Sequence, residues 1–293
     1  MMKKSSFDIA TLISLLSLTG QKVFRFAELR VFVEKNRESL GIPKTLTLPK
    51  LVNQLLETGI VEKVDFDFPF RKEVRYCIGN LRPLEKLLHA YPNAYFSHHT
   101  AATYNKLLSA SLTQLFLNNE QKSIPQFLGE LTQEGIDIAF RNKSRITSNT
   151  ANFDKYLVYL LNGKNTNCLG VKSIVLDSGE EVRITSVERT LIDMVVRPFY
   201  SGGPITVLTA FRNAHSMVSV PTMRNLLNQL AFVYPYHQAV GFYLQLSNCY
   251  SVEDMNLFRD LGFKFDFYLA NAIKEVAYSK DWRMYYPKEL LRI

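Results

Sequence analysis

Two adjacent histidines, His98 and His99, are the residues of this chain whose chemistry first suggests a metal or proton-transfer site. Imidazole binds metal ions and changes its charge near neutral pH. Adjacent residues at a helix start point in different directions, however, and neither an HExxH spacing nor a set of acidic ligands accompanies the pair. Helix packing or a surface position is therefore favoured over a metal site.

Three carboxylates, Asp177, Glu180 and Glu181, could hold the metal ion of a nuclease. The string DSG that begins at Asp177 is an ordinary turn sequence, and the companion lysine of such sites does not stand nearby. Gly163-Lys164 lacks the GxxxxGK[ST] frame of a phosphate-binding loop and favours a turn between strands. We therefore predict no catalytic residue, metal or cofactor and expect a protein that is not an enzyme, with a metal-dependent nuclease as the less favoured alternative.

Side chains suited to contacts with DNA bases lie along the segment that begins near Thr47. Its apolar residues recur at the i, i+3, i+4, i+7, i+8 spacing of a helix: Leu48, Leu51, Val52, Leu55 and Leu56. The opposite side and the approach to the helix carry polar residues: Lys44, Thr45, Thr47, Lys50, Asn53, Gln54 and Glu57. Asn and Gln can form two hydrogen bonds to adenine, Lys can reach guanine, and Thr suits a phosphate or a thymine methyl group.

The elements that must position this helix come from the first eighty residues. Helices are predicted over residues 7–18 and after Phe24, and extended segments over residues 60–66 and 73–78 follow the third helix. Three short helices and a hairpin are the order of a winged helix-turn-helix, whose third helix enters the major groove. Arg71, Lys72 and Arg75 on the hairpin are expected to contact phosphates. A winged helix that binds protein and not operator DNA is the alternative.

The remaining residues, 81–293, mix helices and strands without a regular alternation, so the sequence predicts an α+β fold: a winged helix-turn-helix over residues 1–80 and a larger mixed α/β domain. Thr185 and Glu188 have the spacing of a capping box at the start of a helix over residues 187–196. Arg189 and Asp193 on that helix would form an ion pair worth about 0.3 kcal/mol if exposed.

Two further groups of side chains could contact nucleic acid outside the winged helix. The string Tyr234-Pro235-Tyr236-His237-Gln238 could stack on RNA bases, although core packing is favoured for it. Arg141, Lys143 and Arg145 form the strongest basic cluster of this part of the chain, which a solvated loop would explain equally well.

The net charge and the spacing of the cysteines indicate which partners and which cellular compartment suit the chain. The 293 residues include 35 Lys and Arg against 27 Asp and Glu, and the net charge of +8 fits an anionic partner. Three widely spaced cysteines disfavour disulfides and structural zinc, so a cytoplasmic location is expected. The apolar run at residues 9–18 is too short to span a membrane, and no signal-peptide cleavage site follows it. No membrane partner is expected.

Several strings of the chain resemble the AbiEi family, the antitoxins of bacterial abortive-infection, type IV toxin-antitoxin pairs. The strings are VRITSVERTLIDMVVRPFYSGG (182–203), YFSHHTA (95–101), LTQEGIDIAF (131–140), LLNGKNT (160–166), VYPYHQAVGFYL (233–244), FDFYL (265–269) and WRMYYPK (282–288). They cover most of the chain after residue 95 and include six motif residues without an assigned role: Glu188, Arg189, Asp193, Tyr236, His237 and Gln238.

The resemblance implies a function and two partners. The function is that of an antitoxin that also represses its own operon, and the DNA partner is a set of inverted repeats upstream of that operon. The functional partner is a nucleotidyltransferase-like toxin encoded beside it. Antagonism in type IV systems need not involve a stable complex of toxin and antitoxin.

Overall fold

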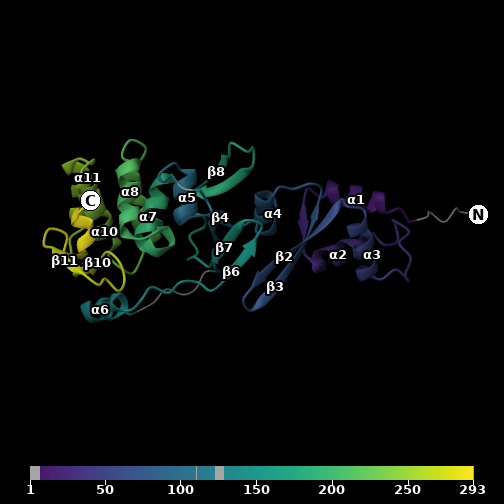
Figure 1. Cartoon of the computed structure of the whole chain (residues 1–293), viewed down its shortest axis with the longest axis horizontal. Helices are drawn as coiled ribbons and strands as arrows, with labels where there is room; N and C mark the ends of the chain where they lie inside the picture. Colours follow the sequence, from purple (N-terminus) through teal and green to yellow (C-terminus); the bar gives the residue numbers. More distant parts are fainter. Residues whose placement is uncertain (1–6, 110, 123–128, 293) are drawn as a thin grey trace, which may run out of the picture. The chain divides into compact units, whose positions relative to one another are not determined.

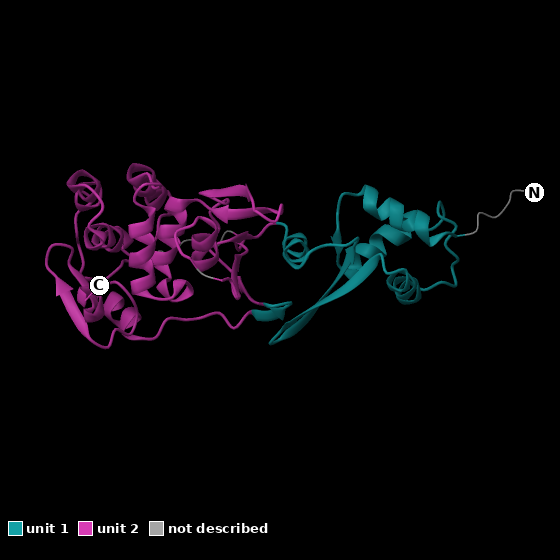
Figure 2. Ribbon diagram, turned by 45° about the horizontal axis from the view of Figure 1, so that its top comes forward, with its two compact units in different colours: residues 1–92, 150–155 teal, residues 93–149, 156–293 magenta. Residues whose placement is uncertain are grey.

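The computed structural model describes residues 7–109, 111–122 and 129–292 and contains both helices and sheets, an α+β fold (Figure 1). The chain divides into two compact units (Figure 2). Unit 1 comprises residues 1–92 and 150–155, and unit 2 comprises residues 93–149 and 156–293. The expected boundary near residue 81 lies instead after Pro92, because helix α4 (Pro83–Ala90) packs against strand β1 (Val23–Phe24) of unit 1.

Unit 1 has the element order of a winged helix-turn-helix, with an antiparallel sheet in the strand order β1-β3-β2. Within residues 7–92 the other helices and strands are α1 (Ile9–Leu18), α2 (Phe26–Asn36), α3 (Leu48–Glu57), β2 (Val61–Phe68) and β3 (Arg71–Ile78). The three helices predicted from the sequence are therefore present, each within a few residues of its predicted start.

The helices of unit 1 form because their apolar stripes meet in one core. Leu51 and Leu55 of α3 are almost fully buried against Leu12 and Leu16 of α1, and Leu29 of α2 joins them. Burying each such leucine contributes about 1.5–3 kcal/mol relative to an exposed one. Since the stripe occupies one side of α3, the core fixes which side of that helix faces the solvent.

The β2–β3 hairpin is long, and other parts of unit 1 cover one face of it around Phe66. The strands pair from Val61 opposite Ile78 to Phe68 opposite Arg71. Phe66 is 1% exposed, its ring stacks on Phe153 of strand β6 (Thr150–Phe153) at 4.8 Å, and Tyr91 meets it edge-on at 5.7 Å. Residues 150–155 belong to unit 1 because this hairpin binds them.

Unit 2 contains a mixed sheet in which neighbouring strands run in the order β7-β5-β4-β9-β8. The pairs β4–β9 and β5–β7 are parallel, and β4–β5 and β8–β9 are antiparallel. The elements of this part are β4 (Tyr95–Phe96), α5 (His98–Tyr104), β5 (Gln114–Asn118), α6 (Gln133–Arg141), β7 (Tyr156–Leu161), β8 (Val171–Val175) and β9 (Glu181–Thr185).

A group of helices around α7 (Val187–Val196) forms the core of unit 2. Helix α7 packs against α5 and against three later helices, and a small sheet with the order β10-β12-β11 closes the core. The later elements are η1 (Pro198–Ser201), α8 (Pro204–Ala214), α9 (Val220–Leu230), α10 (Tyr236–Ser247), α11 (Val252–Arg259), β10 (Phe267–Tyr268), β11 (Val276–Ser279), β12 (Met284–Pro287) and η2 (Lys288–Arg292).

The cap of α7 differs from the predicted one. Ser186 is the N-cap residue, and its hydroxyl accepts a hydrogen bond from the N–H of Arg189 at 3.3 Å. Thr185 is the last residue of β9, opposite Val171, and its buried hydroxyl lies 2.7 Å from the hydroxyl of Thr190. The capping box predicted from Thr185 and Glu188 is therefore wrong, because sheet pairing holds Thr185 in the strand.

Gly241 on α10 is predicted to be irreplaceable for packing reasons. A Cβ atom at this position would overlap the ring of the fully buried Trp282. Alanine favours a helix over glycine by about 1 kcal/mol, but overpacking costs about 1–3 kcal/mol. We expect Gly241→Ala to lower the free energy of unfolding of unit 2, measured by denaturation with the fluorescence of Trp282, the single tryptophan of the chain. A more stable variant would contradict this packing.

Candidate functional site

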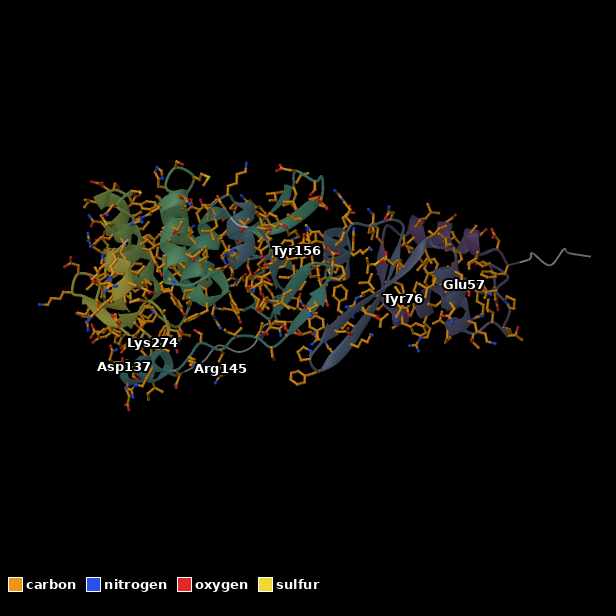
Figure 3. All side chains as sticks on the ribbon, viewed as in Figure 1. Glu57, Tyr76, Asp137, Arg145, Tyr156 and Lys274 are labelled. Carbon is orange, nitrogen blue, oxygen red and sulfur yellow. The ribbon has the colours of Figure 1, made fainter. Side chains whose placement is uncertain are left out.

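The outer face of α3 presents the polar side chains that the sequence predicts as DNA contacts. Lys50, Asn53 and Gln54 are exposed on it, and Glu57, labelled in Figure 3, follows at its C-terminal end. Positions i, i+3, i+4 and i+7 lie on one side of a helix, so the four side chains form a single surface. The exposed residues Lys44, Thr45 and Thr47 precede the helix.

The cations of the hairpin are neutralised by carboxylates of the same hairpin. Nε of Arg71 and Nη2 of Arg75 each lie 2.6 Å from an oxygen of Glu73, and Lys72 Nζ lies 3.0 Å from Asp65. Burial raises the pKa of Glu73, but the hydrogen bonds from both arginines outweigh it and hold that pKa below its usual value. The hairpin therefore offers less positive charge to phosphates than its sequence indicates.

Arg75 does not lie at the surface, contrary to the sequence-based prediction. It is 6% exposed, and its guanidinium lies over the ring of Tyr91, 5.6 Å from the ring centre. The side chain is buried because Tyr91, at the end of α4, covers the hairpin there. Arg75 is therefore removed from the candidate phosphate contacts, while Arg71 and Lys72 remain exposed.

A cavity of about 550 Å³ in unit 2 brings together residues that the sequence analysis treated separately. Arg189 and Asp193 of α7 line it, together with Tyr236 at the start of α10 and His98 at the start of α5. Arg145, labelled in Figure 3 on the segment after α6, also lines it. Because these residues come from distant parts of unit 2, the fold and not a local motif creates the cavity.

Arg189 and Asp193 form a buried ion pair. Arg189 Nε donates to Asp193 Oδ1 at 2.8 Å, and the two side chains are only 5% and 9% exposed. Arg189 Nη1 also donates to the carbonyl of Leu169 at 2.7 Å. The interaction energy of about 0.3 kcal/mol expected for an exposed pair does not apply to this buried pair. Removing one partner of a buried pair costs about 3–5 kcal/mol.

His98 is buried at the cavity wall in an unusual backbone conformation. Its φ is 50°, a region that non-glycine residues adopt at a cost, and such strain clusters at functional sites. Its Nδ1 lies 2.8 Å from the hydroxyl of Ser97, and its ring meets Tyr200 edge-on at 5.4 Å. Burial lowers the pKa of His98 to about 4, so its ring is neutral at neutral pH.

A hydrogen-bond network that sequence reasoning missed holds the loop beside the cavity. Asn118 Nδ2 donates to the hydroxyl of Tyr95 at 2.6 Å, and that hydroxyl donates to Glu120 Oε1 at 2.9 Å. The N–H of Gly163 donates to Asn118 Oδ1 at 3.0 Å, and the N–H of Thr166 donates to Glu120 Oε2 at 2.8 Å. A Cβ atom at Gly163 would come within 2.5 Å of Asn118 Oδ1, so the loop requires glycine there.

Three of the six motif residues have structural contacts outside the cavity. Gln238 is fully buried, and its amide donates to the carbonyls of Phe265 and Trp282. His237 Nε2 lies 2.9 Å from the carbonyl of Gly262. Glu188 accepts a hydrogen bond from the N–H of Ser219, the N-cap residue of α9. These contacts join helices and loops, and none of these three residues is among those that line the cavity.

Asp177, Glu180 and Glu181 lie at the turn between β8 and β9 or next to it. Glu180 accepts a hydrogen bond from the hydroxyl of Ser178. Within residues 7–109, 111–122 and 129–292, no three His, Cys, Asp or Glu side chains are grouped so that they could hold a metal ion. None of the helices in the described ranges has the length and apolar character needed to cross a membrane.

The fold of the chain is similar to one known from a solved structure. It is the crystal structure of RV2827C protein from Mycobacterium tuberculosis, and the alignment covers 98% of this chain and 97% of that protein's chain. The TM-score is 0.57 and the sequence identity is 13%. At this identity the likeness concerns the fold alone. Comparisons with protein families and with curated proteins give no match.

The stability of unit 2 is predicted to depend on the protonation of His98. As the pH drops, the unfolded chain takes up the proton near pH 6.5, whereas the folded chain takes it up only near pH 4. The free energy of unfolding therefore falls between these pH values, by at most ~1.4 kcal/mol per pH unit. We expect His98→Asn, which tolerates a positive φ, to flatten this dependence in denaturation followed by Trp282 fluorescence. An unchanged slope would contradict the buried neutral imidazole. His99 and His237 contribute to the remaining slope, since burial lowers the pKa of each.

Proposed function

We propose that the chain is a DNA-binding repressor of its own operon and the antitoxin of a type IV abortive-infection pair. The observation that carries the DNA-binding part is the orientation of α3. Its leucines are buried in the core of unit 1, and Lys50, Asn53 and Gln54 are exposed on its other side. The third helix of a winged helix-turn-helix inserts such a face into the major groove.

The chemistry of the α3 face suits bases, and its approach suits the DNA backbone. The amides of Asn53 and Gln54 each offer a donor and an acceptor, the pair of groups that recognises adenine. Lys50 can donate to guanine, while Lys44 and Thr45, both exposed, can contact phosphates. Since the hairpin cations are paired with carboxylates, α3 and its approach carry most of the proposed affinity.

The antitoxin part of the proposal is supported by the resemblance of unit 2 strings to the AbiEi family. The implied partner is a nucleotidyltransferase-like toxin encoded by the neighbouring gene. A nuclease has little support, because no metal-holding group is found among the described residues. A winged helix that binds only protein is the rival, and the charge balance of the hairpin favours it.

Operator binding is predicted to depend on the exposed side of α3. Asn53→Ala or Gln54→Ala should cost ~1–3 kcal/mol on the operator and little on random duplex, because a bidentate base contact is lost. Lys44→Ala should instead weaken binding to both duplexes and reduce the salt dependence by about 0.9 in slope, because Lys44 is assigned to a phosphate. Gel shifts of the full chain on its upstream sequence across a salt series measure both effects.

Asn228→Ala and Lys172→Ala are matched controls, because both side chains are exposed on unit 2. Both controls should bind like the original chain. Equal binding of operator and random duplex by the unaltered chain would exclude repression and favour the protein-interaction alternative.

Repression and toxin neutralisation are predicted to be separable. The full chain carrying Lys50→Ala, Asn53→Ala and Gln54→Ala together should lose operator binding but still restore growth when co-expressed with the neighbouring gene. Point variants are preferable to removal of residues 1–80, because that deletion would expose Phe153, which packs on Phe66. Loss of growth rescue by a folded triple variant would show that antitoxin activity requires the α3 face.

A further inference from the structure

The cavity of unit 2 has no role in the proposed repressor activity, and its walls have a distinct chemistry. It is formed by α5, β5, the loop after β7, α7 and the segment before α10. Its size of about 550 Å³ falls within the ~300–1,000 Å³ of small-molecule sites. We propose that this cavity binds a nucleotide, with the base against its tyrosines and the phosphate against its arginines.

Positive charge dominates the lining of the cavity. Arg145, Lys164, Arg189 and Arg197 line it, and Asp193 is the single carboxylate among the described lining residues. Asp193 already neutralises Arg189 through their ion pair. Arg145 and Arg197 are exposed and adjacent, since Arg197 Nη1 donates to the carbonyl of Arg145 at 3.5 Å. A bound anion would therefore meet the charge of these two arginines, since the one carboxylate of the described lining already pairs with Arg189.

Lys164 adds a fixed charge to the same wall. Its ammonium donates to the carbonyls of Leu230 and Ala231 at 2.9 and 3.1 Å, at the C-terminal end of α9. These two neutral carbonyls hold the ammonium in place without cancelling its charge, and no carboxylate among the described residues forms an ion pair with it. The hydrogen bond from Gly163 to Asn118 fixes the loop that carries Lys164. This wall is rigid before any ligand enters, and preorganisation favours binding.

Aromatic side chains form another part of the lining. Tyr234 and Tyr236 both line the cavity, with their ring centres 6.2 Å apart and their planes at 81°. Phe232, also in the lining, meets Tyr236 edge-on at 5.4 Å. Nucleobases stack on aromatic side chains of this kind, whereas inorganic phosphate would gain nothing from them. The combination of rings and cations selects a ligand that has both a base and a phosphate.

An unsatisfied acceptor of Asp193 is an independent sign of a ligand. Asp193 is buried, and its Oδ2 atom has no hydrogen-bond partner among the described residues. A buried acceptor without a donor is costly, and such groups call for an explanation. The exocyclic amine of a base or a ribose hydroxyl would supply the missing donor. A carboxylate carries no such donor, and inorganic phosphate offers only the P–OH of its partly protonated form.

Calorimetry on the full chain in EDTA tests the proposal with AMP, GMP, CMP and UMP as probes. At least one should bind saturably, and its nucleoside and inorganic phosphate should each bind at least about tenfold more weakly, because each lacks one half of the contacts. Arg197→Ala should weaken nucleotide binding about tenfold through the loss of a charge-assisted hydrogen bond. Arg30→Ala, which removes an exposed arginine from α2 of unit 1, should leave it unchanged.

Several outcomes would overturn the proposal. One is that none of the four nucleotides binds at about 1 mM, although the chain shows a cooperative thermal unfolding transition. Another is that phosphate and nucleotide bind with equal affinity, and a third is that Arg197→Ala and Arg30→Ala have equal effects on nucleotide binding. Competition by a short 5′-phosphorylated single strand would identify the ligand as the end of a nucleic acid, and no competition would identify a free nucleotide. The triple α3 variant should retain nucleotide binding, so failure here is distinct from failure of the repressor proposal.

Discussion

The buried ion pair between Arg189 and Asp193 constrains much of unit 2. Two charges removed from water are tolerated only when each is paired, so α7 must keep both residues in register. The Arg189 side chain also holds the loop before β8, because its guanidinium donates a hydrogen bond to the carbonyl of Leu169. The loop passes so close that a Cβ atom at Gly170 would lie 2.9 Å from the Cβ of Arg189. The position of α7, the path of this loop and the cavity wall therefore depend on one interaction.

Unit 1 divides its polar surface between two elements with different roles. The exposed side of α3 keeps its amides and lysine available, because the core takes only the leucine side of the helix. In the hairpin, the cations instead form ion pairs with carboxylates of the same hairpin. Arg71 pairs with Glu73, and Lys72 pairs with Asp65. A hairpin whose cations are already paired gains less from a phosphate, since the existing partner must be displaced. In the proposed binding of DNA, recognition by unit 1 therefore centres on α3.

The sequence predicts the elements whose signals are local. Helices α3 and α7 follow from apolar spacing, and strands β2 and β3 lie within two residues of their predicted limits. Helix α11 was missed because it is short and buries only Phe258, despite a capping box formed by Ser251 and Asp254. The burial of Arg189 and Asp193 could not be foreseen, because the same spacing is common on exposed helices. The Tyr95, Asn118 and Glu120 network joins residues that only the folded sheet and loop bring together.

The path of the chain between the units has a consequence for its biosynthesis. The polypeptide leaves unit 1 at Pro92, returns to it for residues 150–155 and then leaves again. A nascent chain that has emerged as far as Pro92 can assemble α1 to β3, but Phe66 lacks the ring of Phe153 until some sixty further residues have been translated. Folding of unit 1 can therefore be completed only after the ribosome has released residues 150–155, which follow the first part of unit 2 in the chain.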